Sequence, residues 1–340
     1  MTEPGKKGWR HWLPLLLLPL PFMILSLFMG RYAVSGGEVL GSLLRLLGLD
    51  AIPVSSESYA VVTQLRLPRI IAAAFIGAGL SASGAAFQGA FHNPLISPGL
   101  LGVTSGAGFG AALAILLIPF AWGSYLLAFV FGAAAVGLSY WIACIYRTVP
   151  TIMLVLGGTV VTAIFNALLS LLKYVADPEQ QLPAIVYWLM GDVSSVEYGD
   201  FWALIPIIAG LVILLLFGWR INVLSMGDKE AQAMGIPVQA SKNWVILAAT
   251  LATAGSVCLA GNIGWVGLVI PHISRMLVGN DNRKLLPVSM AVGAAFLVAV
   301  DTVSRTVAQS EIPLGILTSL IGAPFFIYLL KKTKGGGWRA

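Results

Sequence analysis

The longest uncharged stretch of the chain most strongly limits its fold. Residues 70–146 contain no Asp, Glu, Lys or Arg. A membrane-spanning helix needs about 20 apolar residues, so this stretch alone has room for several helices and the turns between them. Over the whole chain only 10% of residues are charged, whereas a soluble domain carries roughly 25%. The sequence therefore predicts an all-α polytopic membrane protein and argues against a water-covered globular domain.

Uncharged runs bounded by charges or turn residues predict about ten transmembrane helices in a single domain, residues 1–340. The expected ranges are 12–32, 67–89, 98–118, 124–146, 151–173, 200–219, 243–261, 264–278, 285–305 and 313–330. Residues 243–274 form an uncharged run that is too long for one helix and short for two. The sequence "GNIGW" at 261–265 and Pro271 predict a broken or short helix near 261–278, which must face protein or a cavity.

The distribution of charge predicts the orientation of these helices. Cytoplasmic segments of membrane proteins carry an excess of Lys and Arg. If both termini lie in the cytoplasm, the cytoplasmic segments hold most of the 20 Lys and Arg residues, and most acidic residues lie outside. The net charge of +6 is then explained by topology, and we expect no nucleic-acid partner.

One motif invites a nucleotide-binding interpretation. Gly106, Gly108 and Gly110 form a G-x-G-x-G pattern, but no acidic residue follows within about 20 positions, as a dinucleotide site requires. Gly102, Gly106 and Gly110 instead recur every four residues, which favours close packing against another helix. We expect helix packing here. The preceding "HNPLISP" (92–98) predicts a sharp cytoplasmic turn between two spans.

The chain offers little that could support catalysis. The three histidines are far apart and no Cys or carboxylate lies at metal-ligand spacing, so we expect neither a metal site nor a catalytic site. A phosphate-binding G-x-x-x-x-G-K-[ST] motif is absent from the sequence. Asp301 and Arg305 are the only ionisable candidates within a span, and we interpret them as an ion pair at a helix end. This scarcity argues against a secondary transporter, which usually keeps a functional charge in the membrane.

The longest polar cytoplasmic segment is residues 220–242. Its sequence "SMGDKEAQAMGI" predicts a short helix that begins near Asp228 and ends near Gly235. Ala231, Ala233 and Met234 add apolar side chains, which we expect to be exposed. Either a solvated connector or a docking helix for a cytoplasmic partner would fit.

Three segments together resemble the FecCD-type permease family, the membrane subunits of type II ABC importers for iron chelates and vitamin B12. The segments are 65–110, beginning "LRLPRIIAAAFIGAG", 224–236, "LSMGDKEAQAMGI", and 261–332, beginning "GNIGWVGLVIPHISRM". The resemblance implies a homodimer in the inner membrane of a prokaryote, two ATP-binding cassette subunits below it and a substrate-binding protein above it. It also implies that ATP and Mg²⁺ belong to the partner ATPase, with no cofactor in this chain.

The resemblance also implies roles for individual residues. Arg66, Arg69 and Arg305, which otherwise look like isolated arginines on the outer side, would bind acidic residues of the substrate-binding protein. Asn93, Leu95 and Thr151 would form the cytoplasmic gate. The residues that would couple the chain to the ATPase are Met226, Gly227, Asp228, Lys229, Glu230, Ala231, Met234 and Gly235.

The cargo implied by the resemblance is a metal chelate, with a ferric siderophore or haem preferred and a corrinoid such as vitamin B12 as the alternative. Molybdate-type oxyanion importers belong to related groups. A secondary transporter is the alternative from another class. In either case the chain itself is not expected to be an enzyme.

Overall fold

The computed structural model describes residues 12–118, 120–145 and 151–332. All regular secondary structure in these residues is helical. The α-helices are α1 (Pro19–Phe28), α2 (Gly36–Leu46), α3 (Ser56–Ala60), α4 (Leu67–Ala90), α5 (Val103–Leu117), α6 (Ala121–Cys144), α7 (Thr151–Val175), α8 (Gln181–Met190), α9 (Leu204–Leu216), α10 (Gly218–Leu224), α11 (Asp228–Ala233), α12 (Val238–Ala260), α13 (Val266–Val278), α14 (Asn282–Ser304) and α15 (Leu314–Lys332). Short 3-10 turns cover Leu13–Leu17, Pro98–Leu101 and Tyr198–Ala203, and a π-helical segment covers Val61–Arg66.

Each predicted span overlaps at least one of these helices. Among the described residues, six helical segments are long and apolar enough to cross a membrane, and five shorter apolar helices accompany them. The chain is therefore a multi-pass membrane protein. The number of ten crossings and the cytoplasmic placement of both termini stay predictions, because length and composition alone fix neither.

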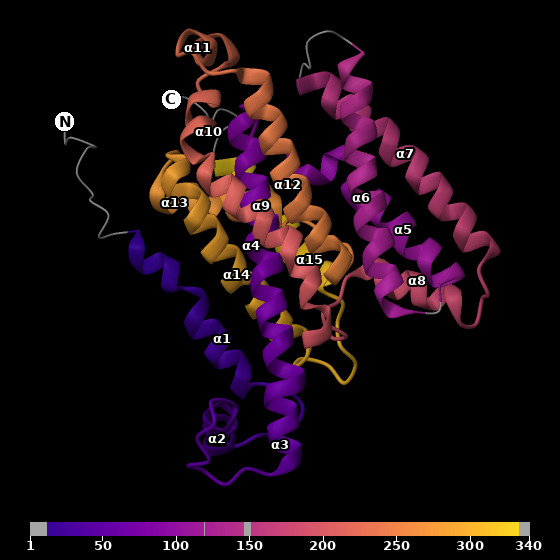
Figure 1. Cartoon of the computed structure of the whole chain (residues 1–340), viewed down its shortest axis with the longest axis vertical. Coiled ribbons are helices and arrows are strands. Elements are labelled where there is room, and N and C mark those ends of the chain that lie inside the picture. The colour runs from indigo at the N-terminus through magenta and orange to yellow at the C-terminus, as the bar shows by residue number, and fades with distance from the viewer. Residues whose placement is uncertain (1–11, 119, 146–150, 333–340) are drawn as a thin grey trace.

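Helix α4 forms the centre of the bundle and packs against α9, α12, α13 and α14 (Figure 1). Its small residues explain why neighbouring backbones approach so closely. A Cβ atom at Gly77 would overlap the main chain of Gly293 on α14, and one at Gly84 would overlap that of Gly267 on α13. The glycines therefore fix the spacing of two helices, α13 and α14, from α4.

Helices α5, α6 and α7 form a second group beside this centre (Figure 1). Gly106 and Gly110 of α5 lie directly against the main chain of α6, at Phe131 and Leu127. Gly102 differs from the packing prediction. It precedes α5 in the left-handed conformation, with a φ of 84°, and faces α7 rather than α6. Only two of the three glycines therefore share a packing face.

The predicted break near residue 261 is confirmed. Helix α12 ends at Ala260, α13 begins at Val266, and the residues between them are not helical. Pro271 plays no part in the break, since it lies inside α13.

The two ends of the bundle carry different structures. Helices α2 and α3 lie at one end, and α11 lies at the opposite end (Figure 1). Helix α2 begins with a capping box in which the Ser35 hydroxyl accepts from the Glu38 N–H and the Glu38 carboxylate accepts from the Ser35 N–H. The Ser58 hydroxyl donates to the same carboxylate at 2.9 Å, so α2 and α3 form one ordered unit.

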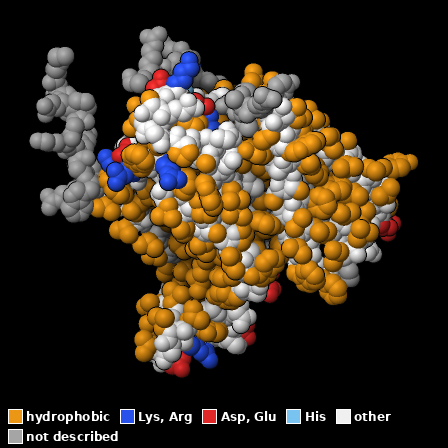
Figure 2. Space-filling view, turned by 45° about the horizontal axis from the view of Figure 1, so that its top comes forward, with side chains coloured by type: hydrophobic (Ala, Val, Ile, Leu, Met, Phe, Trp, Pro, Cys, Tyr) orange, Lys and Arg blue, Asp and Glu red, His pale blue; other side chains and the backbone are white. Residues whose placement is uncertain are grey.

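Apolar side chains cover much of the outer surface (Figure 2). On α7 the exposed positions Leu156, Val160 and Ile164 follow one face of the helix. A soluble monomer rarely exposes a continuous apolar surface of this kind. The face is suited to lipid or to another membrane subunit.

Candidate transport site

A cluster of four charged side chains lies where α4 and α14 meet. Asp301 is fully buried and accepts a hydrogen bond from the Nε of Arg69 at 2.7 Å. Arg69 also pairs through Nη1 with Glu311 at 2.9 Å, and the Nε of Arg305 lies 3.6 Å from Asp301 Oδ2. The predicted Asp301–Arg305 pair is therefore present, but Arg69 is the closer partner of Asp301. The cluster ties α4 to α14 and to the segment after α14.

The three arginines predicted to dock a partner are buried, at 4–6% exposure. Arg66 donates to the main-chain oxygens of Leu27 at 2.6 Å and Tyr32 at 2.5 Å, and Arg305 donates to that of Ser26 at 2.6 Å. Carbonyls at a helix C-terminus need such donors, so both side chains complete the end of α1.

The expectation of isolated outer arginines is therefore wrong for this conformation, since all three bond within the chain. Their binding to a partner protein stays a prediction, and it requires the cluster to open.

The turn after α4 holds two of the three predicted gate residues. Asn93 Oδ1 accepts from the Leu95 N–H at 2.9 Å, which closes a tight Asx-type turn. The Leu95 side chain is exposed at the tip of this turn, and His92 before it has a φ of 49°. Thr151 begins α7, but its side chain lies outside the described residues. A gating role for the three residues stays a prediction.

The predicted coupling segment forms α11, with Gly227 before it and Gly235 after it, both at positive φ. Met226, Asp228, Lys229, Glu230, Met234 and Gly235 are exposed. Ala231 is fully buried, so the expectation that it is exposed is wrong. It anchors the short helix, and the residues around it form the surface available to a partner.

Lys242 connects this helix to the turn after α4, and sequence reasoning missed it. Its buried ammonium group lies 2.7 Å from the Asp228 carboxylate and 5.6 Å from the centre of the Phe91 ring. A second contact joins His92 Nδ1 and the main-chain oxygen of Ser225 at 2.5 Å. The predicted gate and the predicted coupling helix are therefore physically linked.

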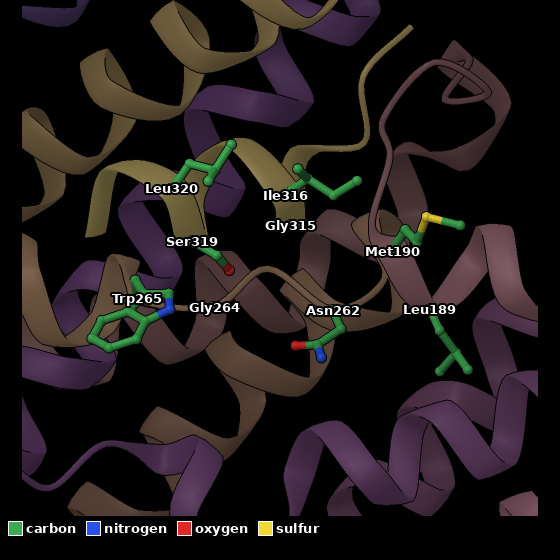
Figure 3. Close-up of a pocket in the computed structure, with 9 residues that line it drawn as sticks. All are labelled: Leu189, Met190, Asn262, Gly264, Trp265, Gly315, Ile316, Ser319 and Leu320. Carbon is green, nitrogen blue, oxygen red and sulfur yellow. The ribbon is translucent and has the colours of Figure 1, made fainter. Parts of the chain in front are cut away.

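Two adjoining cavities surround the break between α12 and α13. The larger, about 560 Å³, lies between the end of α8, the break and α15 (Figure 3). The smaller, about 140 Å³, lies between the break, α4 and the Ser97–Gly99 segment before α5. Asn262, Gly264 and Trp265 line both. The lining of both consists of uncharged residues.

Among the described residues, no three His, Cys, Asp or Glu side chains lie close enough to hold a metal ion. The functional features are therefore an ion cluster, a turn, a surface helix and cavities, and none of them is a catalytic constellation.

Comparison with known proteins places the chain in a family. The model of the FecCD transport family matches residues 15–332. The chain belongs to the FecCD transport family. Members of this family are permease subunits of ABC importers, which are not themselves enzymes and work with ATPase and substrate-binding partners.

Family members with different cargo resemble the chain to a similar degree. The chain is 41% identical to the molybdate import system permease protein MolB of Haemophilus influenzae, over 95% of this chain and 96% of that one. It is 41% identical to the cobalamin import permease of Halobacterium salinarum over 82% and 75%, and 40% identical to a Helicobacter pylori iron chelatin permease over 81% and 83%. A solved inward-facing metal-chelate type ABC transporter matches with a TM-score of 0.84 and 39% identity, over 95% and 99%.

Proposed function

We propose that two copies of this chain form the membrane core of an ATP-driven importer in the cytoplasmic membrane of a prokaryote. Two ATPase subunits would bind below α11, and a substrate-binding protein would deliver cargo at the end that carries α2 and α3. The observation that carries this proposal is the separation of these two ends, together with the contacts of Lys242, which join Asp228 of α11 to Phe91 at the start of the turn after α4. Such a link would let an ATPase movement reach the pathway as a rigid-body change.

The exposed apolar face of α7 supports the proposal that a second copy of the chain packs there. Leu156, Val160 and Ile164 offer a continuous surface without charged side chains. A secondary transporter is less well supported. Among the described residues, Asp301 is the only carboxylate buried within a candidate span, and it is already paired with two arginines. A coupling ion or proton would have to displace these arginines.

The cargo we propose contains a metal. Molybdate is the first candidate, because the molybdate permease combines high identity with nearly complete coverage of both chains. A ferric siderophore or haem, which the sequence favoured, is the second candidate, supported by the iron chelatin relative. A corrinoid is the third.

The test uses the complete importer, purified with its own ATPase and binding protein and reconstituted in proteoliposomes. We expect ATP-dependent uptake of radiolabelled molybdate or of a labelled ferric siderophore, and no uptake when the phosphate-binding lysine of the ATPase is replaced. Uptake that persists without a functional ATPase would refute the proposal and favour a secondary transporter.

The position of the ATPase is tested separately. Met226 and Met234 flank α11 and are 59% and 53% exposed. We expect the double variant Met226→Asp/Met234→Asp to lose the ATPase during purification, because charge disrupts an apolar contact. Leu47→Asp, at a more exposed position (76%) at the opposite end, should retain it. Equal retention in both variants would contradict the assignment of α11.

A further inference from the structure

One face of α2 carries a row of leucine side chains. Leu40, Leu43, Leu44 and Leu47 recur at the spacing of a single helix face, and Gly36 begins the same face one turn earlier. Leu40 and Leu47 are exposed, and Leu43 and Leu44 are half-buried. We call these four residues the leucine row. Apolar surface of this kind marks a contact with a membrane or with another protein.

The rest of the α2 surface is packed or charged. Val39 and Ser42 are buried. Arg45 lies nine residues after the first residue of the helix, which places it half a turn away from Gly36 and from the leucine row. Its Nε lies 3.5 Å from Asp50 Oδ1, and its guanidinium group lies 4.9 Å from the centre of the Tyr59 ring. The helix is therefore amphipathic, with its charged groups on the side opposite the leucines.

Gly36 places the leucine row beside the end of α1. A Cβ atom at Gly36 would lie 3.7 Å from Cε1 of Phe28, the last residue of α1. Phe28 is exposed, as are Leu20 and Ile24 on the same apolar helix. Because Gly36 shares a face with the leucines, the leucine row begins where the exposed apolar surface of α1 ends. The two surfaces are therefore continuous.

The orientation of α2 agrees with this contact. In Figure 1 α2 is seen nearly end-on, whereas α1 and α4 run down the picture, so α2 lies across the direction of the spans. Figure 2 shows charged side chains at the tip of the unit below the bundle and apolar side chains along its flank. An amphipathic helix that lies across the spans at their end has the arrangement of a helix at a membrane–water interface.

We propose that α2 is an interfacial anchor whose partner is the lipid surface at the end of the bundle that carries α2 and α3. The leucine row lies among the headgroups and the first part of the acyl chains, and Arg45 and Asp50 lie in water. Two observations identify lipid as the occupant: the continuity with the apolar surface of α1, and the charges on the opposite face. The proposal requires only that the chain crosses a membrane, so it is independent of the proposed importer function.

The anchor holds the central helix of the bundle at a fixed depth. The Ser58 hydroxyl donates to the Glu38 carboxylate of α2 at 2.9 Å. Helical structure then continues without a break from Ser56 to Ala90 and includes the whole of α4. A movement of α4 along the membrane normal would therefore pull the leucine row out of lipid.

Nitroxide spin labels test the depth of α2 in the full-length chain in lipid nanodiscs. Cys144 is exposed and is replaced by Ser, while Cys258 is buried and stays unlabelled. A label at Leu40→Cys is compared with one at Arg45→Cys, the matched control on the opposite face of the same helix. Ile24→Cys, on the exposed side of α1, provides the reference for lipid. The measurement compares collisions of each label with oxygen, which concentrates in lipid, and with a water-soluble nickel chelate.

We expect the ratio of oxygen to nickel collisions at Leu40 to approach that at Ile24 and to exceed that at Arg45. The proposal is overturned if Leu40 is as accessible to the nickel chelate as Arg45, because α2 would then lie in water. It is also overturned if the Leu40 label is shielded from both reagents, since a second copy of the chain excludes oxygen and lipid does not.

Adding the purified binding protein distinguishes the remaining occupant. If the nickel chelate reaches the Leu40 label until the binding protein is added, the leucine row is a docking surface for that protein and the lipid proposal is wrong. An oxygen-to-nickel ratio that stays high with and without the binding protein supports the anchor. The substituted side chains are exposed, so each labelled variant should fold normally, and thermal unfolding checks this.

Discussion

Replacing Asp301 with Asn should destabilise the chain more than any other single change in the outer charge cluster. Asp301 is completely buried and is the shared counter-charge of Arg69 and Arg305. Asn has nearly the same volume but no charge, so two buried guanidinium groups lose their shared counter-charge, and Arg69 keeps only the partly exposed Glu311. Removing one member of a buried ion pair costs roughly 3–5 kcal/mol. We expect a loss of unfolding free energy in that range.

The matched comparison is Glu311→Gln. The Glu311 side chain is 24% exposed and pairs only with Arg69, which keeps Asp301 in this variant. A partly exposed pair is worth about 1 kcal/mol or less. Equilibrium unfolding by SDS in mixed micelles, followed by Trp fluorescence, measures both variants.

The triple variant Arg69→Met/Asp301→Leu/Arg305→Met provides a further check. Replacing all members of a buried ion cluster by apolar residues is often nearly neutral, so this variant should lose less stability than Asp301→Asn alone. The reasoning is refuted if Asp301→Asn is no more destabilising than Glu311→Gln, because the buried carboxylate would then not be the main source of the cluster's stability.

Three further changes test other parts of the structure. Lys242→Met should reduce the amount of cargo taken up per ATP hydrolysed by the reconstituted importer, because the link between α11 and the turn after α4 is lost. The control Lys229→Met, on the exposed face of α11, should leave this ratio unchanged. Gly84→Ala should lower the free energy of unfolding by roughly 1–3 kcal/mol, because the added methyl group overpacks against α13. Gly137 has no neighbouring atom within 4 Å of an added Cβ, so Gly137→Ala should not destabilise the chain in the same unfolding assay. The capping-box and hydroxyl hydrogen bonds lower the pKa of the Glu38 carboxyl below its usual 4.5. The stability that the ionised carboxylate gives to α2 is therefore present above that pH and is lost as the pH falls through the folded-state pKa. Hydrogen exchange of the α2 amides should rise on acidification, and it should rise less in Glu38→Gln.

The helical layout could be predicted from the sequence because lipid imposes a simple requirement. Each span needs a long apolar run, and charges and turn residues mark its ends. The break near Gly261 was predictable for the same reason, since its apolar run fits neither one helix nor two. The continuation of α4 back through residues 56–66 was not, because polar residues in this segment interrupt the apolar run, and the predicted span therefore began at residue 67.

The charge cluster could not be located from local sequence. Arg69 and Asp301 are 232 positions apart, and no spacing rule connects residues on different helices. One signal was available, since a charge within a span must find a partner inside the bundle, and this would have suggested pairing Asp301 with an arginine at the end of another span. The cavities are lined by residues from several segments far apart in the sequence, so only the folded chain reveals them.

The glycine contacts of the two helix groups determine where the chain can deform. Because Gly77 and Gly84 lock α4 to α14 and α13 by their backbones, these helices cannot slide past one another without a steric clash. Gly106 and Gly110 impose the same restriction on α5 and α6. A relative rotation of the two groups would therefore bend the two stretches of chain that join them, one from α4 to α5 and one from α7 through α8 to α9. The first contains His92 and Gly102 at positive φ, and the second contains Gly191 at positive φ.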